Sequence, residues 1–206
     1  MADDQYTEPP WKALTRPPAH ARELMPAVAA VMDEAGAELR SLEAIAVGVG
    51  PGTFTGLRIG IATARALAGA AGLALRPVSS LAALAAGIEG EGNETGAALA
   101  LIDAKRGELF AALYRDGSEV WPPFVAKPEE VARRVRDAGL QPRAAGDGSV
   151  RFREVLEAAG IDVAPGASRA HVVRALHVCR LAAKLPGTPP EAVLPDYIRA
   201  PDAKPQ

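Results

Sequence analysis

Residues 45–80 read IAVGVGPGTFTGLRIGIATARALAGAAGLALRPVSS and contain two apolar runs with a glycine-rich turn between them. Residues 45–49 and 73–78 are short apolar runs bounded by turn-forming residues, a pattern typical of buried strands. Residues 57–71 are rich in alanine and leucine, which favours a helix with Thr55 as its N-cap. A strand, a helix and a second strand in this order predict a right-handed βαβ unit in a parallel sheet.

The sequence on either side of this unit extends the same α/β pattern. Upstream, residues 19–35 place apolar side chains at helical spacing. Downstream, residues 97–102 and 108–114 are apolar runs around a polar turn, which predicts an antiparallel strand pair. We therefore expect two α/β lobes, divided as a flexible N-terminal arm, an N-terminal lobe, a C-terminal lobe and a C-terminal tail at residues 1–18, 19–92, 93–190 and 191–206.

Composition excludes several classes of protein. The chain has 206 residues, 49% of them hydrophobic, a net charge of −2 and a single cysteine. This cysteine count excludes an internal disulfide framework, and the near-neutral charge gives no broad nucleic-acid-binding surface. The longest uncharged stretch, residues 44–57, is shorter than the ~18 residues of a membrane span. We expect a cytoplasmic protein without membrane contact.

The glycine-rich turn and one aspartate are the candidates for chemistry. Residues 50–56 link a predicted strand to a predicted helix, where glycines allow close backbone approach and helix amides can face an anion. The alternative is a tight turn that packs the helix onto the sheet. Asp103 follows a buried strand, a position used by catalytic and ligand-binding residues, but its sequence context favours the alternative, a carboxylate that forms the turn.

The histidines and the cysteine do not form a metal-binding pattern. His20, His171 and His177 lack the spacing of metal ligands, so each is interpreted as a structural residue. Cys179 falls on the apolar face of a helix predicted after Ser168, which indicates a small core residue. The sequence thus predicts neither a metal nor a cofactor.

Residues 47–67, VGVGPGTFTGLRIGIATARAL, closely resemble the hallmark of the TsaB family of tRNA threonylcarbamoyladenosine biosynthesis proteins. The resemblance continues in PVSSL at 77–81, IDAKRGE at 102–108 and PDYIR at 195–199. The residues that form the signature loop are Gly50, Pro51, Gly52, Thr53, Phe54, Thr55, Gly56 and Arg58.

This resemblance implies the two-lobed actin/Hsp70/sugar-kinase-like (ribonuclease-H-like) fold, in a member without chemistry of its own. The family's members pair with a TsaD-like catalytic paralogue, and a TsaE-like ATPase joins the complex. That complex transfers a threonylcarbamoyl group to the adenosine 3′ of the anticodon, so this chain is expected to contact tRNA mainly indirectly. The paralogue carries a His-x-x-x-His metal pair, whereas the residue four after His20 is Leu24. No catalytic residue is therefore expected.

Two other functions remain open. One is a nucleotide-binding enzyme of the same superfamily that uses residues 50–56 and Asp103. The other is a metalloprotease, for which the sequence offers no set of metal ligands.

In the family, two helices of the first lobe form the interface with the paralogue or with a second copy. Carried onto this chain, those helices are residues 19–35 and 57–71. The alternative is that their apolar faces cover the chain's own sheet. On the first interpretation, Ile61→Asp would abolish co-purification with the paralogue. The candidate interface residues are Leu24, Val28, Val31, Leu57, Gly60, Ile61, Ala64 and Ala68.

The N-terminus departs from the family's pattern. Members begin with strands carrying an Ile-Asp-Thr-like motif, and residues 1–18 contain neither such a strand nor the motif. We therefore expect the first strands of the N-terminal lobe to be missing, which would leave strand 45–49 with an exposed edge. A misassigned start, a truncated divergent copy and a partner that completes the sheet are the three explanations.

Overall fold

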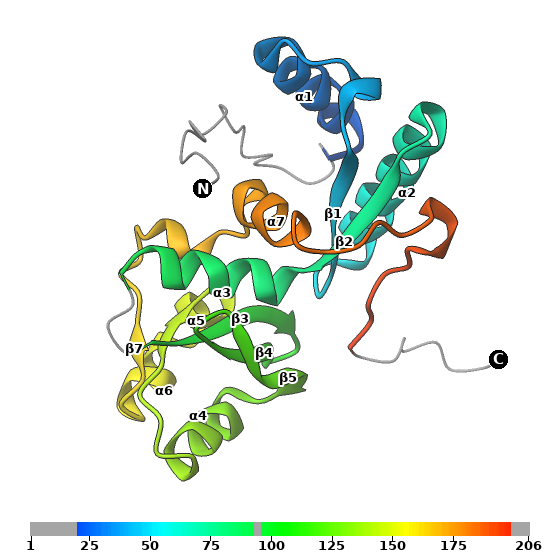
Figure 1. The fold of residues 1–206 in the computed structure, drawn as a ribbon. Coiled ribbons are helices and arrows are strands. Elements are labelled where there is room, and N and C mark those ends of the chain that lie inside the picture. Colours follow the sequence, from blue (N-terminus) through cyan, green and yellow to red (C-terminus); the bar gives the residue numbers. More distant parts are fainter. Residues whose placement is uncertain (1–19, 93–95, 199–206) are drawn as a thin grey trace, which may run out of the picture.

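The computed structural model describes residues 20–92 and 96–198, which form two α/β lobes (Figure 1). The helix α3 (Ser80–Gly90) leaves the first lobe and runs along the second. This arrangement confirms the predicted fold class. The predicted N-terminal arm at residues 1–18 lies outside the described residues.

The first lobe is built on the predicted βαβ unit. Strands β1 (Ala44–Gly50) and β2 (Ala74–Ser79) pair in parallel, and α2 (Phe54–Ala71) makes the crossover between them. On the far side of β2, Leu75 exchanges two backbone hydrogen bonds with Thr188, of 2.9 and 2.7 Å. Within residues 20–92 and 96–198, no strand pairs with the other edge of β1. The lobe also contains α1 (His20–Ala35) and the short 3₁₀ helix η1 (Leu39–Ser41).

Helix α2 begins earlier than its sequence pattern predicts. Thr53, not Thr55, is the N-cap, because Thr53 has an extended backbone and its hydroxyl accepts a 3.3 Å hydrogen bond from the Gly56 N–H. Thr55 lies in the first turn of the helix. At the other end Gly72 adopts a φ of +70°, the left-handed conformation that commonly ends helices.

The second lobe contains a mixed sheet whose described strands lie in the order β5-β4-β3-β6-β7. The pair β3–β4 is antiparallel, as predicted, while β3–β6 and β6–β7 are parallel. Strand β5, which we did not predict, contains Pro122 and Pro123 and lies at a sheet edge, where a missing N–H is tolerated. The strand bounds are β3 (Ala97–Lys105), β4 (Glu108–Arg115), β5 (Ser118–Ala126), β6 (Arg143–Ala145) and β7 (Asp162–Val163).

Helices cover both faces of this sheet. On one face, α3 buries Leu81, Leu84 and Ile88 against alanines of β3 and β4. On the other, α4 (Pro128–Asp137) and α6 (Arg153–Ala158) pack on the leucines of β3 and β4. The short helix α5 (Asp147–Arg151) follows β6. Although α3 falls within residues 19–92, its core contacts are therefore with the second lobe.

Helix α7 (Ala175–Ala182) connects the lobes a second time. It packs on α3 and on the strands β1 and β2, where Ala182 joins a small core with Val78 and Ala83. The single long helix predicted after Ser168 is wrong, because the chain forms the 3₁₀ helix η2 (Arg169–His171) and then an extended link before α7. Cys179 is exposed rather than a core residue. A last 3₁₀ helix, η3 (Pro190–Ala192), precedes the tail.

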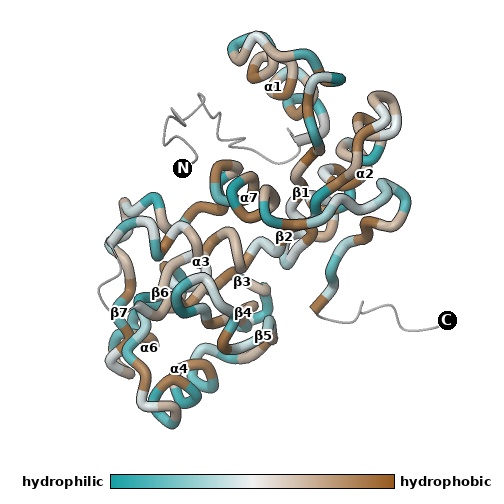
Figure 2. The backbone as a smooth tube through the Cα atoms, in the orientation of Figure 1, coloured by the Kyte–Doolittle hydropathy of each residue, from teal (hydrophilic) through white to brown (hydrophobic). Residues whose placement is uncertain are grey.

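Figure 2 shows apolar segments along α1 and α2 as well as along the strands. Among the residues that the structure describes, no helix is long and apolar enough to cross a membrane.

Candidate functional site

A cleft of about 710 Å³ lies between the glycine loop of the first lobe and the β3–β4 turn of the second. It brings together two motifs that the sequence analysis singled out, residues 50–56 and Asp103. Its polar walls are formed by Thr53, Ser80, Asp103, Lys105, Arg106, Asp147 and His171.

The glycine loop is shaped by the C-terminal tail that crosses it. Gly50 adopts a φ of +128°, and a Cβ placed there would lie 2.7 Å from the Asp196 carbonyl oxygen. The Asp196 N–H donates a 2.8 Å hydrogen bond to the Val49 carbonyl. Glycine is thus required at this position by a close backbone approach, which accounts for it without any bound phosphate.

Two residues of the signature loop, Phe54 and Arg58, contact the same tail. The Arg58 guanidinium lies 3.8 Å from the centroid of the Phe54 ring, and its Nε donates a 3.2 Å hydrogen bond to the Tyr197 hydroxyl. The rings of Phe54 and Tyr197 stack with centroids 5.8 Å apart, although Phe54 remains 51% exposed. The glycine loop and the tail residues Asp196 and Tyr197, far apart in sequence, are therefore in direct contact, and Phe54 also lines the cleft.

Asp103 forms ion pairs with two cationic side chains. Its carboxylate is only 7% exposed and pairs with Lys105 Nζ at 2.8 Å and with an Arg151 nitrogen at 2.7 Å. Burial opposes ionisation of Asp103, but the hydrogen bonds from Lys105 and Arg151 outweigh it and lower its pKa below the ordinary value. A carboxylate held this way is a poor general base. The interpretation of Asp103 as a turn-forming residue is thus favoured over a catalytic role.

The turn after Asp103 presents two basic residues to the cleft. Lys105 and Arg106 have φ values of +63° and +56°, in the left-handed region that side chains other than those of glycine rarely adopt. Gly107, with a φ of +78°, completes the turn into β4. Both basic residues line the cleft together with Asp103 and Asp147, so its second-lobe wall carries charges of both signs.

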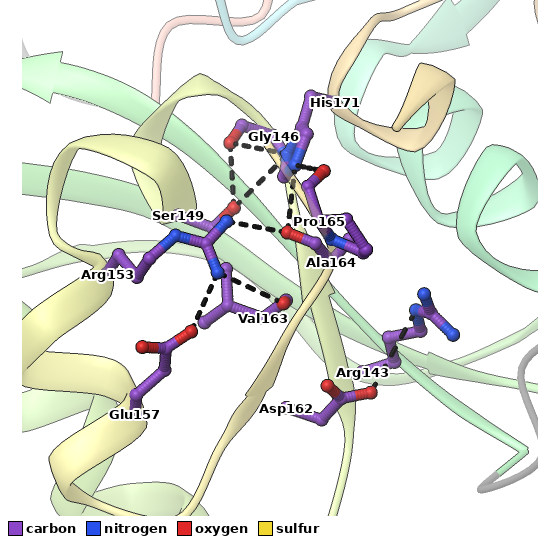
Figure 3. Close-up of polar contacts among 10 residues, drawn as sticks. All are labelled: Arg143, Gly146, Ser149, Arg153, Glu157, Asp162, Val163, Ala164, Pro165 and His171. Carbon is purple, nitrogen blue, oxygen red and sulfur yellow. Dashed lines mark hydrogen bonds and ion pairs between the residues drawn. The ribbon is translucent and has the colours of Figure 1, made fainter. Parts of the chain in front are cut away.

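The back wall of the cleft is a hydrogen-bonded network around His171 (Figure 3). The Gly146 N–H donates to His171 Nδ1 at 3.1 Å, while His171 Nε2 lies 3.0 Å from the Pro165 carbonyl oxygen. These partners assign the proton to Nε2. Arg153 of α6 donates to the Val163 carbonyl oxygen of β7 at 3.2 Å and to the Ala164 carbonyl oxygen at 2.6 Å. The contacts of His171 with backbone groups give it a structural role. The described residues include no group of His, Cys, Asp and Glu suited to a metal.

The candidate interface residues of α2 differ in how exposed they are. Ile61, Ala64 and Ala68 are 3%, 6% and 0% exposed and pack against β1 and β2, so their assignment to a partner surface is wrong. Their spacing is that of a helix stripe which covers the chain's own sheet. Leu57 and Gly60 are half-buried. The exposed side of α2 instead carries Ala62, Ala66 and Ala70.

Helix α1 lies beside α2 and has no buried residue among those whose side chains are described. Leu24 and Val28 are half-buried, while Val31 and Met25 are 38% and 45% exposed. We use the term α1–α2 surface for Met25, Val31, Ala62, Ala66 and Ala70.

The sequence of this chain is similar to those of known proteins. The family model for TsaD, described as tRNA N6-adenosine threonylcarbamoyltransferase, matches residues 16–159. The tRNA threonylcarbamoyladenosine biosynthesis protein TsaB of Escherichia coli is 38% identical over 125 residues, which cover 58% of this chain and 54% of that protein. The chain spans about half the length, or less, of the first curated relatives that it matches.

Solved structures extend the similarity over most of the chain. YeaZ from Pseudomonas aeruginosa has a TM-score of 0.72 and 31% identity, covering 86% of this chain and 84% of that one. A crystal structure of an uncharacterized protein with similarity to peptidase YEAZ has a TM-score of 0.74 and 33% identity, covering 89% and 86%.

Proposed function

The chain belongs to the TsaD family and to its TsaB (YeaZ) members, and on this basis we propose that it is a non-catalytic subunit of the tRNA threonylcarbamoyladenosine-forming complex. Its fold is the two-lobed actin/Hsp70/sugar-kinase-like fold. In this role the chain binds and supports a TsaD-like catalytic paralogue. A TsaE-like ATPase is the third component, tRNA is contacted mainly through the paralogue, and the location is cytoplasmic.

The uncovered apolar side chains of α1 are the observation that carries this proposal. Among the described residues, the 16-residue amphipathic helix α1 contacts α2, has no buried side chain, and leaves Val31 and Met25 38% and 45% exposed. Exposed apolar side chains on α1 and exposed small residues on α2, a helix that contacts α1, suit a helical partner, because small side chains let two helices approach closely.

A supporting rather than catalytic role agrees with the state of the cleft. Asp103 is held by two cations, and both ring nitrogens of His171 are within hydrogen-bonding distance of backbone groups. Neither side chain is available to take or give a proton to a substrate without breaking these contacts.

The proposal is tested by co-purification with the TsaD-like protein of the same organism. We expect a stable complex with the parent chain and a loss of at least about tenfold in affinity for Ala62→Asp, because a charge enters an apolar helix interface. Ala158→Asp, at an exposed position of α6 in the second lobe, is the matched control and should bind normally. Equal binding by the parent and Ala62→Asp would place the interface elsewhere.

A second candidate function is nucleotide binding in the cleft. The observation in its favour is that the glycine loop faces Lys105 and Arg106 across a space of about 710 Å³. Calorimetric titration of the isolated chain with ATP separates the two functions. Micromolar affinity would support the nucleotide-binding enzyme, whereas the partner role predicts no heat of binding at that concentration.

A further inference from the structure

The C-terminal tail contacts both lobes, and we use the term strap for its residues 193–198. Val193, at the start of the strap, is 2% exposed and belongs to the core that α2 forms with β1 and β2. Asp196 and Tyr197 then contact the glycine loop of the first lobe. Ile198, the next residue, packs against the core that α3 forms with β3 and β4 of the second lobe.

The strap lies at the cleft, whereas the other two connections between the lobes lie elsewhere. Strand β2 continues directly into α3, and α7 packs on α3, β1 and β2. Residues of α3 that line the cleft, Ser80 and Leu84, differ from those that line the space between α3 and α7, Ala82 and Ala86. The lobes can therefore turn about the β2–α3 junction and α7, and such a turn changes the width of the cleft.

The strap has no slack between its contacts with the two lobes. Tyr197 and Ile198 are consecutive residues, and consecutive Cα atoms are only about 3.8 Å apart. The first-lobe wall of the cleft therefore cannot move away from the second lobe while both side chains keep their contacts.

The contact of Tyr197 is the one that can be released. Tyr197 is 39% exposed, and it is held by a ring stack with the exposed Phe54 and one hydrogen bond from Arg58. Exposed contacts of this kind are weak, because water or another molecule can replace them. Val193 is buried, so the start of the strap stays in place when Tyr197 leaves Phe54.

We propose that the strap is a releasable connection that controls the width of the cleft. While Tyr197 lies on Phe54 and Ile198 lies on the second-lobe core, the lobes are held together; when Tyr197 is released, they turn about the β2–α3 junction and α7 and the cleft opens. Phe54 also lines the cleft, so the strap acts directly on the cleft wall. The contacts that carry this proposal do not include the α1–α2 surface, so it does not depend on the proposed function.

The distance between spin labels on the two lobes of the full chain tests this proposal. Labels at Ala66→Cys on α2 and Arg136→Cys on α4 occupy exposed positions, and Cys179→Ser removes the single native cysteine. In pulsed electron paramagnetic resonance, the chain with an intact strap should give one main distance. Tyr197→Ala should raise the ratio of open to closed chains about tenfold and so produce a second distance, because the ring stack and the hydrogen bond are lost together.

Two further variants test the other end of the strap and its specificity. Ile198→Asn breaks the contact with the second lobe and should populate the same second distance as Tyr197→Ala. Leu194→Ala is the matched control, because Leu194 belongs to the strap but is 66% exposed, and it should give the single distance of the intact strap. Circular dichroism confirms that each variant is folded. A single unchanged distance in Tyr197→Ala, its absence from Ile198→Asn alone, or an equal second distance in Leu194→Ala would each overturn the proposal.

Discussion

Truncation of Ile61 to alanine tests which side of α2 faces the sheet. Ile61 is 3% exposed and packs with Val47 and Leu75 of the two first-lobe strands. Loss of such a buried side chain to alanine costs about 2–5 kcal/mol, part of it from the cavity left behind. With a urea dependence of about 2 kcal/mol per molar, the unfolding midpoint should fall by about 1–2.5 M.

The assay is urea unfolding followed by circular dichroism, with Ala62→Ser as the control. Ala62 is the next residue and is exposed, so its change to serine should cost no more than about 0.7 kcal/mol of helix propensity. If Ile61→Ala unfolds at the parent's midpoint, α2 does not bury this stripe and our assignment of its faces fails. If the assignment holds, Ile61→Asp reports on folding and not on the partner interface.

Three further predictions concern the backbone and pH. Gly50→Ala should destabilise the chain by about 1–3 kcal/mol, since Gly50 has a φ of +128° and meets the tail, whereas Gly60→Ala in open space within α2 should be neutral or stabilising in thermal melts. Asp103 has a lowered pKa, so its contribution to stability is complete at neutral pH and lost as pH falls through that pKa; Asp103→Asn should flatten the acid limb of stability against pH. Burial raises the pKa of Tyr114 to about 12, so its contribution is complete below pH 10.0 and lost toward 12, and Tyr114→Phe should remove this alkaline loss.

The sequence was sufficient to predict the βαβ unit but not the faces of its helix. The apolar runs at 45–49 and 73–78 predicted β1 and β2 to within one or two residues because each is short and bounded by turns. Along α2, however, small and apolar residues occur on all sides, so Ala62 and Ala64 look equivalent in the sequence. Only packing against the sheet distinguishes the exposed alanine from the buried one.

The candidate site shows a similar limit. The motifs that form it were visible, but the contact of Tyr197 with Phe54 and Arg58 joins segments far apart in the chain, and periodicity says nothing of such contacts. His177 was interpreted as a structural residue, and its ring packs against Gly87 of α3 with 8% of the side chain exposed.

Hydrogen exchange of the chain, alone and mixed with the TsaD-like protein of the same organism, tests the partner role most directly. The proposal predicts slower amide exchange in α1 and α2 on mixing, and unchanged exchange in α4 at the far end of the second lobe (Figure 1). Protection confined to the second lobe, or none in α1 and α2 at concentrations that saturate binding, would contradict it.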